Sequence, residues 1–282
     1  MVLISDLSLE DYTARQLREL EPDKLLERAM TARPSGNYRY DGGPSWTPQP
    51  YPGFAVVSMV DENPGNTELP DALQTIQAEL LRQCPWEGAL YLLPPSSFHQ
   101  TIANTLSGTR FLEHIYNPGL EPEFPGWVGE AFNGMAGNAS GVDEDANGIA
   151  GTINGTIGAP GDLVMNLIGL SIFGTALGVL GVFEQESAYQ KVMRFREGLY
   201  GDEVMGGLDI KCTRPFIGHV SLAYVEQDLN PTHKLALAET VYQINQDHFS
   251  VPLPFYMNQT GLRRYEHLSE FKTRPAYPRY YF

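Results

Sequence analysis

The hydrophobic positions of the chain follow two periods, one typical of helices and one typical of strands. Within residues 69–83, Leu73, Ile76 and Leu80 recur at helical spacing and predict an amphipathic helix. Residues 54–60 form a continuous apolar run that predicts a buried strand. Similar patterns predict strands over 89–93, 98–103, 164–172, 176–182, 215–224, 250–257 and 262–271, and helices over 187–199 and 232–246. This alternation predicts an α+β fold with two sheets or lobes that face each other.

The first 50 residues have a different character from the rest. Residues 7–32 are predicted to be helical, with Ser8 capping the first helix and Pro22 starting a second. The residues that follow are rich in glycine, proline and aromatic side chains and predict an extended segment. We therefore expect residues 1–50 to pack as a helical and extended segment on a domain that spans residues 51–282.

Residues 117–161 interrupt the regular pattern. They are dense in Gly, Asn, Asp and Pro, and residues 121–161 contain no Lys or Arg, so a long inserted loop is predicted. Residues 143–148 resemble the opening of a calcium-binding loop, but the twelfth position is Asn154 where a bidentate Glu is required. An acidic turn is therefore the better interpretation.

Residues 163–183 carry no charge over a length that can span a bilayer. Polar residues such as Asn166 and Ser171 interrupt the stretch, and its flanks, Asp162 and Glu184, are acidic where membrane helices usually have basic anchors. Several glycines also disfavour a helix here. We interpret the stretch as two buried strands that turn near residue 174, and we expect no membrane association.

The composition narrows the classes of partner. With 42% hydrophobic and 19% charged residues, the chain is an ordinary globular protein rather than a disordered one. Its formal net charge of −15 repels polyanions, which argues against a long nucleic-acid duplex as partner. A small phosphorylated ligand remains compatible, because it needs only a local positive pocket.

The cysteines and the start of the chain indicate a compartment. Cys84 and Cys212 match no disulfide or metal-binding framework, so a reducing compartment is expected. The first residues lack the basic segment and the long apolar core of a signal peptide. We therefore expect a cytoplasmic protein.

Two H-x-[ST] triplets in predicted strands are the candidate chemistry. Because residues i and i+2 of a strand point to the same face, His99 would share a face with Thr101, and His219 with Ser221. The triplet alone is weak evidence, because His248 and His267 also begin one, the first at a helix end and the second among charged residues. The strand context of the other two marks them as the candidates.

A phosphodiester site needs these residue types. One histidine can accept a proton from the attacking water or hydroxyl while the other protonates the leaving oxygen, because the unperturbed histidine pKa is about 6.5. Thr101 and Ser221 can donate hydrogen bonds to non-bridging phosphate oxygens. The scheme needs no metal or other cofactor, and the sequence contains no convincing metal-binding cluster. The residues leave open which histidine is the base and which is the acid.

A buried histidine that bonds a neighbouring group is the competing interpretation for either histidine alone. The matched strand contexts favour a shared site. Tyr224 follows the parity of Val220 and Leu222, so without a bulge it points away from His219.

The C-terminal tail adds further candidates. Residues 261–282 are locally basic and aromatic in an acidic protein. Arg263, Arg264 and Tyr265 are therefore candidates for holding a phosphate and stacking a base. Ordinary packing of an exposed strand is the alternative for each of them.

Residues 91–101, which read YLLPPSSFHQT, and residues 52–57, which read PGFAVV, together with the partner triplet at His219, resemble the two-histidine (2H) phosphoesterase superfamily. That superfamily includes LigT-like RNA ligases and cyclic phosphodiesterases, and the resemblance is closest to a poorly characterised bacterial and fungal branch. It covers roughly residues 50–272. It implies a bilobal, pseudo-symmetric α+β fold, in which two antiparallel sheets flank a central cleft that holds both motifs and helices lie outside.

The resemblance also implies a function. It is that of a metal-independent phosphodiesterase acting on a small nucleotide, such as a 2′,3′-cyclic phosphate, a 2′-5′ linkage or a cyclic dinucleotide. The alternative is a binding module that holds a nucleotide or an RNA end in the same place without turnover.

Overall fold

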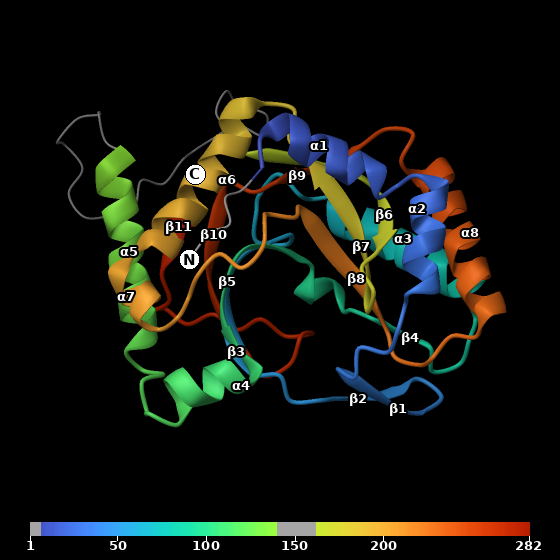
Figure 1. Cartoon of the computed structure of the whole chain (residues 1–282), viewed down its shortest axis with the longest axis horizontal. Coiled ribbons are helices and arrows are strands. Elements are labelled where there is room, and N and C mark those ends of the chain that lie inside the picture. Colours follow the sequence, from blue (N-terminus) through green and yellow to red (C-terminus); the bar gives the residue numbers. More distant parts are fainter. Residues whose placement is uncertain (1–6, 140–161) are drawn as a thin grey trace.

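The computed structural model describes residues 7–139 and 162–282 and has α+β architecture. Two antiparallel sheets form the body of the molecule, one of four strands in the order β11-β10-β3-β5 and one of five in the order β4-β8-β7-β6-β9 (Figure 1). Every strand pairing in both sheets is antiparallel. The predicted α+β class and the two sheets are therefore confirmed.

The four-stranded sheet consists of β3 (Gly53–Met59), β5 (His99–Ser107), β10 (Gln259–Tyr265) and β11 (Arg279–Tyr281). Strand β3 is buried on both faces, because Phe54 and Val56 belong to the main hydrophobic core while Val57 and Met59 belong to a second, smaller cluster. Besides these two side chains, the second cluster contains Ala55 and Tyr265, with Leu268 and Phe271 packed against it.

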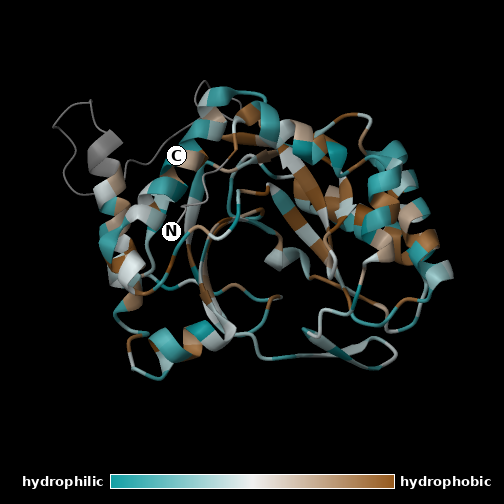
Figure 2. Cartoon of the chain, in the orientation of Figure 1, coloured by the Kyte–Doolittle hydropathy of each residue, from teal (hydrophilic) through white to brown (hydrophobic). Residues whose placement is uncertain are grey.

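The five-stranded sheet consists of β4 (Leu90–Leu92), β8 (His219–Val225), β7 (Ala176–Val182), β6 (Val164–Ile172) and β9 (Leu253–Tyr256). The predicted strands 164–172 and 176–182 are confirmed as β6 and β7, and Gly174 turns between them with a φ of 71°. Figure 2 shows the hydrophobic residues gathered on these strands and the hydrophilic ones on the outer helices. Over the residues that the structure describes, no helix is both long and apolar enough to cross a membrane.

Helices cover the outer side of each sheet (Figure 1). Those beside the five-stranded sheet are α1 (Leu9–Arg18), α2 (Pro22–Met30), α3 (Leu69–Gln83) and α8 (Pro231–His248). Those beside the four-stranded sheet are α4 (Gly108–Phe111), the π-helical turn η2 (Leu112–Tyr116), α5 (Phe124–Ala139), α6 (Glu186–Gly201) and α7 (Glu203–Gly207). As predicted, Ser8 caps α1 by accepting a hydrogen bond from the Asp11 N–H, and Pro22 opens α2.

The loop predicted for residues 117–161 is wrong for the part that the structure describes, because α5 occupies Phe124–Ala139. Phe124, Val128, Ala131 and Phe132 lie on one buried face of this helix at helical spacing. The apolar stripe offsets the low helix propensity of the intervening glycines. The calcium-loop candidate 143–148 and Asn154 lie outside the described residues.

Two further segments differ from the prediction. The extended segment after residue 33 contains a hairpin of β1 (Tyr38–Gly42) and β2 (Ser45–Pro48). The strand predicted over 262–271 ends at Tyr265, and residues 266–271 form a loop that is closed by backbone hydrogen bonds between Arg264 and Lys272. Packing of Phe271 on the second hydrophobic cluster stabilises this loop in place of a longer strand.

Candidate functional site

His99 and Thr101 share one face of β5, as their spacing predicts. They lie opposite Met59 and Val57 of β3 and are half-buried, whereas Gln100 between them is fully buried. His219 and Ser221 share one face of β8 in the same way and lie opposite Leu180 and Gly178 of β7.

A β-bulge follows each of the two triplets. The pairing of β5 with β3 skips Ile102, and the pairing of β8 with β7 skips Leu222. A bulge reverses the alternation of side chains beyond it. Asn104 therefore lies on the face of His99, and Tyr224 lies on the face of His219. The sequence alone left this bulge open, and its presence places Tyr224 on the site face.

A buried side chain donates to the carbonyl at each bulge. Arg196 of α6 donates to the Ile102 carbonyl (2.7 Å) and Gln77 of α3 donates to the Leu222 carbonyl (2.7 Å). An unpaired buried carbonyl is costly, and each side chain supplies a buried donor next to a bulge. The Leu222 carbonyl also accepts from the backbone N–H of Leu93 (2.9 Å), so Gln77 is its second donor. The helices behind each sheet thus stabilise the irregularity that shapes the site.

The two imidazoles make matching backbone hydrogen bonds. Nδ1 of His99 bonds the Ser97 carbonyl (2.7 Å), and Nδ1 of His219 bonds the Ile217 carbonyl (3.1 Å). Because a carbonyl can only accept, Nδ1 of each ring carries the proton, and in the neutral form Nε2 keeps its lone pair. Within the described parts of the chain, no protein group hydrogen-bonds either Nε2, nor the side-chain hydroxyl of Thr101 or Ser221.

Gln100 joins the two motif strands. Its buried amide donates to the Ile217 carbonyl (3.2 Å) and accepts from the backbone N–H of His219. These bonds hold the start of β5 beside the start of β8, although the residues are more than a hundred positions apart in sequence. The two histidines are close enough that positive charge on His219 disfavours positive charge on His99.

Burial keeps both histidines neutral. Burial lowers the pKa of His99 to about 4, and the bond to the Ser97 carbonyl opposes this shift. Burial also lowers the pKa of His219, and the nearby Arg214 lowers it further. Aromatic rings cause part of this desolvation, since Phe271 lies 4.1 Å from His99 and Phe173 lies 5.1 Å from His219 between ring centroids.

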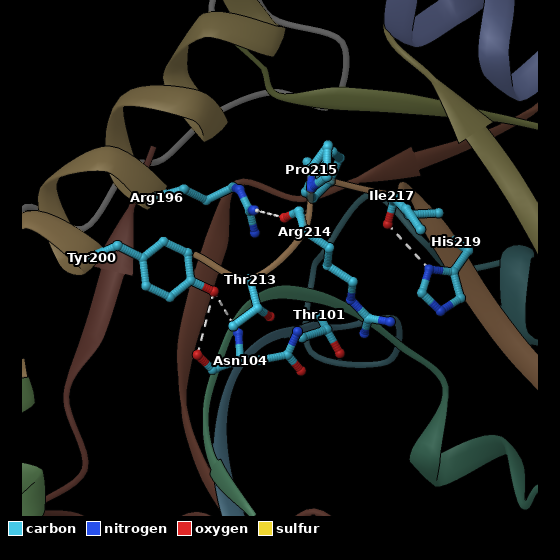
Figure 3. Close-up of a pocket in the computed structure, with 10 residues that line it drawn as sticks. Thr101, Asn104, Arg196, Tyr200, Thr213, Arg214, Pro215, Ile217 and His219 are labelled. Atoms are coloured by element: carbon cyan, nitrogen blue, oxygen red, sulfur yellow. Dashed lines mark hydrogen bonds between the residues drawn. The ribbon is translucent and has the colours of Figure 1, made fainter. Parts of the chain in front are cut away.

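A pocket opens beside the second motif (Figure 3). Thr101 and His219 both line it, whereas His99 and Ser221 lie outside its lining. The other lining residues are Asn104, Arg196, Tyr200, Thr213, Arg214, Pro215, Phe216 and Ile217. No Asp or Glu is among these ten residues, so the pocket is locally positive in an acidic protein.

The candidates from the C-terminal tail occupy different faces of β10. Arg263 lies on the same face as Val57, but its guanidinium is buried and ion-paired with Glu62. Arg264 lies on the opposite face, where it pairs with Glu121 at 2.7 Å and lies over the ring of Phe111 at 4.5 Å.

Tyr265 is on the site face but is buried beside Phe271, with 5.1 Å between ring centroids. Burial raises the pKa of its phenol, which therefore stays neutral. Tyr265 contributes apolar surface next to His99 through Phe271.

The other two H-x-[ST] triplets are not on the two motif strands. His248 ends α8, and His267 in the loop after β10 bonds the hydroxyl of Ser269 (2.8 Å). The positions of Arg214, Gln100 and Gln77 carry no distinguishing signal in the sequence, because their roles depend on which strand or helix they meet. Over residues 7–139 and 162–282, no three His, Cys, Asp or Glu side chains gather in a way that could hold a metal ion.

No protein-family model and no curated protein matches the sequence. Among solved structures, the chain is similar to ATU0111, a conserved protein of unknown function from Agrobacterium tumefaciens str. C58. The TM-score is 0.56 at 13% sequence identity, and the match covers 88% of this chain and 97% of that chain. At this identity the similarity concerns the fold alone, and it extends over nearly the whole of both chains.

Proposed function

We propose that the chain is a 2H phosphoesterase that hydrolyses a small nucleotide phosphodiester without a metal, using His99 and His219 as a proton-transfer pair. The observation that carries this proposal is the matched hydrogen bonding of the two imidazoles. Each Nδ1 is held by a carbonyl two residues earlier in the chain, which leaves each Nε2 for a ligand.

We also propose that the two sheets are the lobes of a bilobal, pseudo-symmetric fold with the substrate cleft between them. Three repeated features support this. Each motif strand has a bulge directly after its triplet, a buried donor on the bulge carbonyl, and a proline four residues before its histidine (Pro95 and Pro215).

We assign the base to His99, because burial lowers its pKa to about 4 and so keeps its Nε2 unprotonated at neutral pH. Its neutral Nε2 takes a proton from a water or hydroxyl as that oxygen attacks phosphorus. His219, protonated when an anionic substrate lies against it, gives its Nε2 proton to the leaving oxygen as the P–O bond breaks. The hydroxyls of Thr101 and Ser221 donate to the non-bridging oxygens, where charge builds up in the transition state.

Aromatic side chains on the same face favour a nucleotide over other phosphodiesters. Tyr224 lies opposite Tyr91 across the β4–β8 pair, and the ring of Tyr38 stacks on Tyr91 with 3.6 Å between centroids. Aromatic faces stack nucleobases without needing hydrogen-bond readout.

One observation favours the alternative, a nucleotide-binding module without turnover. Burial lowers the pKa of both histidines and so disfavours the protonated imidazole that an acid requires. A binding module would need none.

The test measures hydrolysis of 2′,3′-cyclic nucleotides, 2′-5′-linked dinucleotides and cyclic dinucleotides by purified protein in excess EDTA. We expect turnover, with His99→Ala and His219→Ala each lowering kcat by about 10²–10⁴-fold. His248→Ala is the matched control, because it removes a histidine of the same triplet pattern at the end of the outer helix α8. Full activity in both motif variants would show the assignment to be wrong. Tight nucleotide binding with no product after long incubation would instead support the binding module.

A further inference from the structure

The pocket beside His219 extends beyond what cleavage of one phosphodiester requires. From Thr101 and His219 it continues to Asn104, Tyr200 and Thr213, which the proposed proton transfers do not use. In Figure 3 these three side chains lie on the opposite side of Arg214 from the His219 ring. The extension is polar, and the pocket lining contains two arginines and no acidic residue.

The two arginines have different tasks. Arg196 is buried, and its guanidinium donates to the carbonyls of Ile102 (2.7 Å) and Arg214 (3.3 Å). It therefore stabilises the bulge of β5 and positions the segment that precedes β8. The Cys212 thiol also donates to the Arg214 carbonyl (3.2 Å), so the backbone of Arg214 is held from two sides.

The side chain of Arg214 is exposed and extends into the space between Thr101 and His219 (Figure 3). Within the described residues, its guanidinium has no carboxylate or other hydrogen-bond acceptor. An arginine with a fixed backbone, no protein partner and several polar neighbours in a pocket matches the geometry that binds a phosphate group.

We propose that Arg214, with Thr213 and Asn104, forms a subsite for a second anionic group of the substrate, next to the phosphodiester held by the two histidines. This inference rests on the proposed function of the histidine pair. It narrows the substrate class to nucleotides with a further phosphate near the cleaved one, such as 5′-phosphorylated 2′-5′-linked oligonucleotides or cyclic dinucleotides. A cyclic mononucleotide without a second phosphate would leave the subsite empty.

The experiment compares two stable ligands that differ by one phosphate, adenosine 3′-monophosphate and adenosine 3′,5′-bisphosphate. Their dissociation constants are measured calorimetrically at fixed ionic strength for the wild type, Arg214→Gln, Arg214→Lys and Arg82→Gln. Arg82 is the matched control, because it is an exposed arginine on α3 that pairs with Glu79 outside the pocket. In parallel, kcat/KM is measured for adenosine 2′,3′-cyclic phosphate with and without a 5′-phosphate.

The wild type and Arg82→Gln are expected to prefer the bisphosphate by roughly tenfold to a hundredfold, the range of a charge-assisted hydrogen bond. Arg214→Gln brings that ratio close to one, and Arg214→Lys restores part of it. Equal binding of the two ligands by the wild type, or an unchanged ratio in Arg214→Gln, would overturn the subsite. Absence of turnover in the wild type with the bisphosphate preference intact would overturn the proposed hydrolysis and leave the subsite standing.

Discussion

At the scale of single residues, the site depends on how each imidazole is surrounded. A backbone carbonyl sets the tautomer of each ring, and neighbouring aromatic rings exclude water from it. Exclusion of water disfavours the charged form, which explains the lowered pKa of both histidines. The loop after β10 thus affects the protonation of His99 through Phe271.

We predict that Phe271→Ala raises the pKa of His99 from about 4 toward the ordinary value of 6.5, because water then reaches the ring. A base is active above its pKa, so the acidic limb of the kcat/KM profile should move upward by about one pH unit or more. The profile of Leu268→Ala is the control, since Leu268 lies in the same loop and packs on the same cluster without a ring contact to His99. An acidic limb that stays in place in Phe271→Ala would contradict the role of this ring.

At the scale of secondary-structure elements, the β-bulges after the triplets decide which side chains reach the site. The β8 bulge brings Tyr224 to the face of His219, and Gln77 of α3 stabilises it by donating to the carbonyls of Leu93 (2.8 Å) and Leu222 (2.7 Å). The helix behind the sheet is therefore coupled to the geometry in front of it.

We predict that Gln77→Leu lowers both stability and activity. The buried Leu93 carbonyl loses its side-chain donor, which costs about 1–3 kcal/mol. The Leu222 carbonyl keeps only the bond from the Leu93 N–H (2.9 Å), so the bulge can relax and displace Tyr224 and Ser221. Asn245→Leu is the matched control, because Asn245 also makes two bonds to a strand, with the backbone N–H and carbonyl of Leu170. Chemical denaturation and kcat/KM are measured for both variants.

The expected result is comparable destabilisation in the two variants and loss of activity only in Gln77→Leu. Equal activity in the two variants would show that the bonds from α3 do not affect the site.

At the scale of the whole molecule, the protein combines a net charge of −15 with a pocket that has no acidic lining. The net negative charge of the protein disfavours binding of long polyanions, whereas the two arginines of the pocket can attract a small anion. The buried histidines also link folding to pH. A group with a lowered folded pKa binds fewer protons in the native state than in the unfolded state, so stability falls as pH falls between the two pKa values.

For His99 this window runs from a pKa of about 6.5 in the unfolded chain to about 4 in the native protein. Across it, the free energy of unfolding falls by up to about 3 kcal/mol as the pH falls. We predict that His99→Gln removes this part of the pH dependence, and that His267→Gln does not. Urea unfolding at pH 7.5 and 4.5 measures the difference. If the free energy of unfolding changed between these two pH values by the same amount in the wild type and in His99→Gln, His99 would titrate normally in the folded protein.

The sequence by itself determined the strands of the two main sheets except β11, and the helices α1, α2, α3, α6 and α8, because the spacing of buried side chains is a local property of the chain. Residues 69–83, 164–172 and 176–182 were predicted with the bounds that the structure has. It also singled out the two triplets, because their strand context differs from that of His248 and His267. Helix α5 was not predicted, because the glycines in this segment favoured a loop over the helix that its apolar stripe indicates.

Only the tertiary structure decided which side chains and backbone groups surround the two triplets. The bulges, the Gln100 bridge and the position of Arg214 depend on contacts between segments far apart in sequence, which no local period encodes. The same applies to the tail, where the consecutive residues Arg263 and Arg264 lie on opposite faces of β10 and pair with different carboxylates. Side-chain direction in a strand follows from register, and register follows from the packing of both sheets.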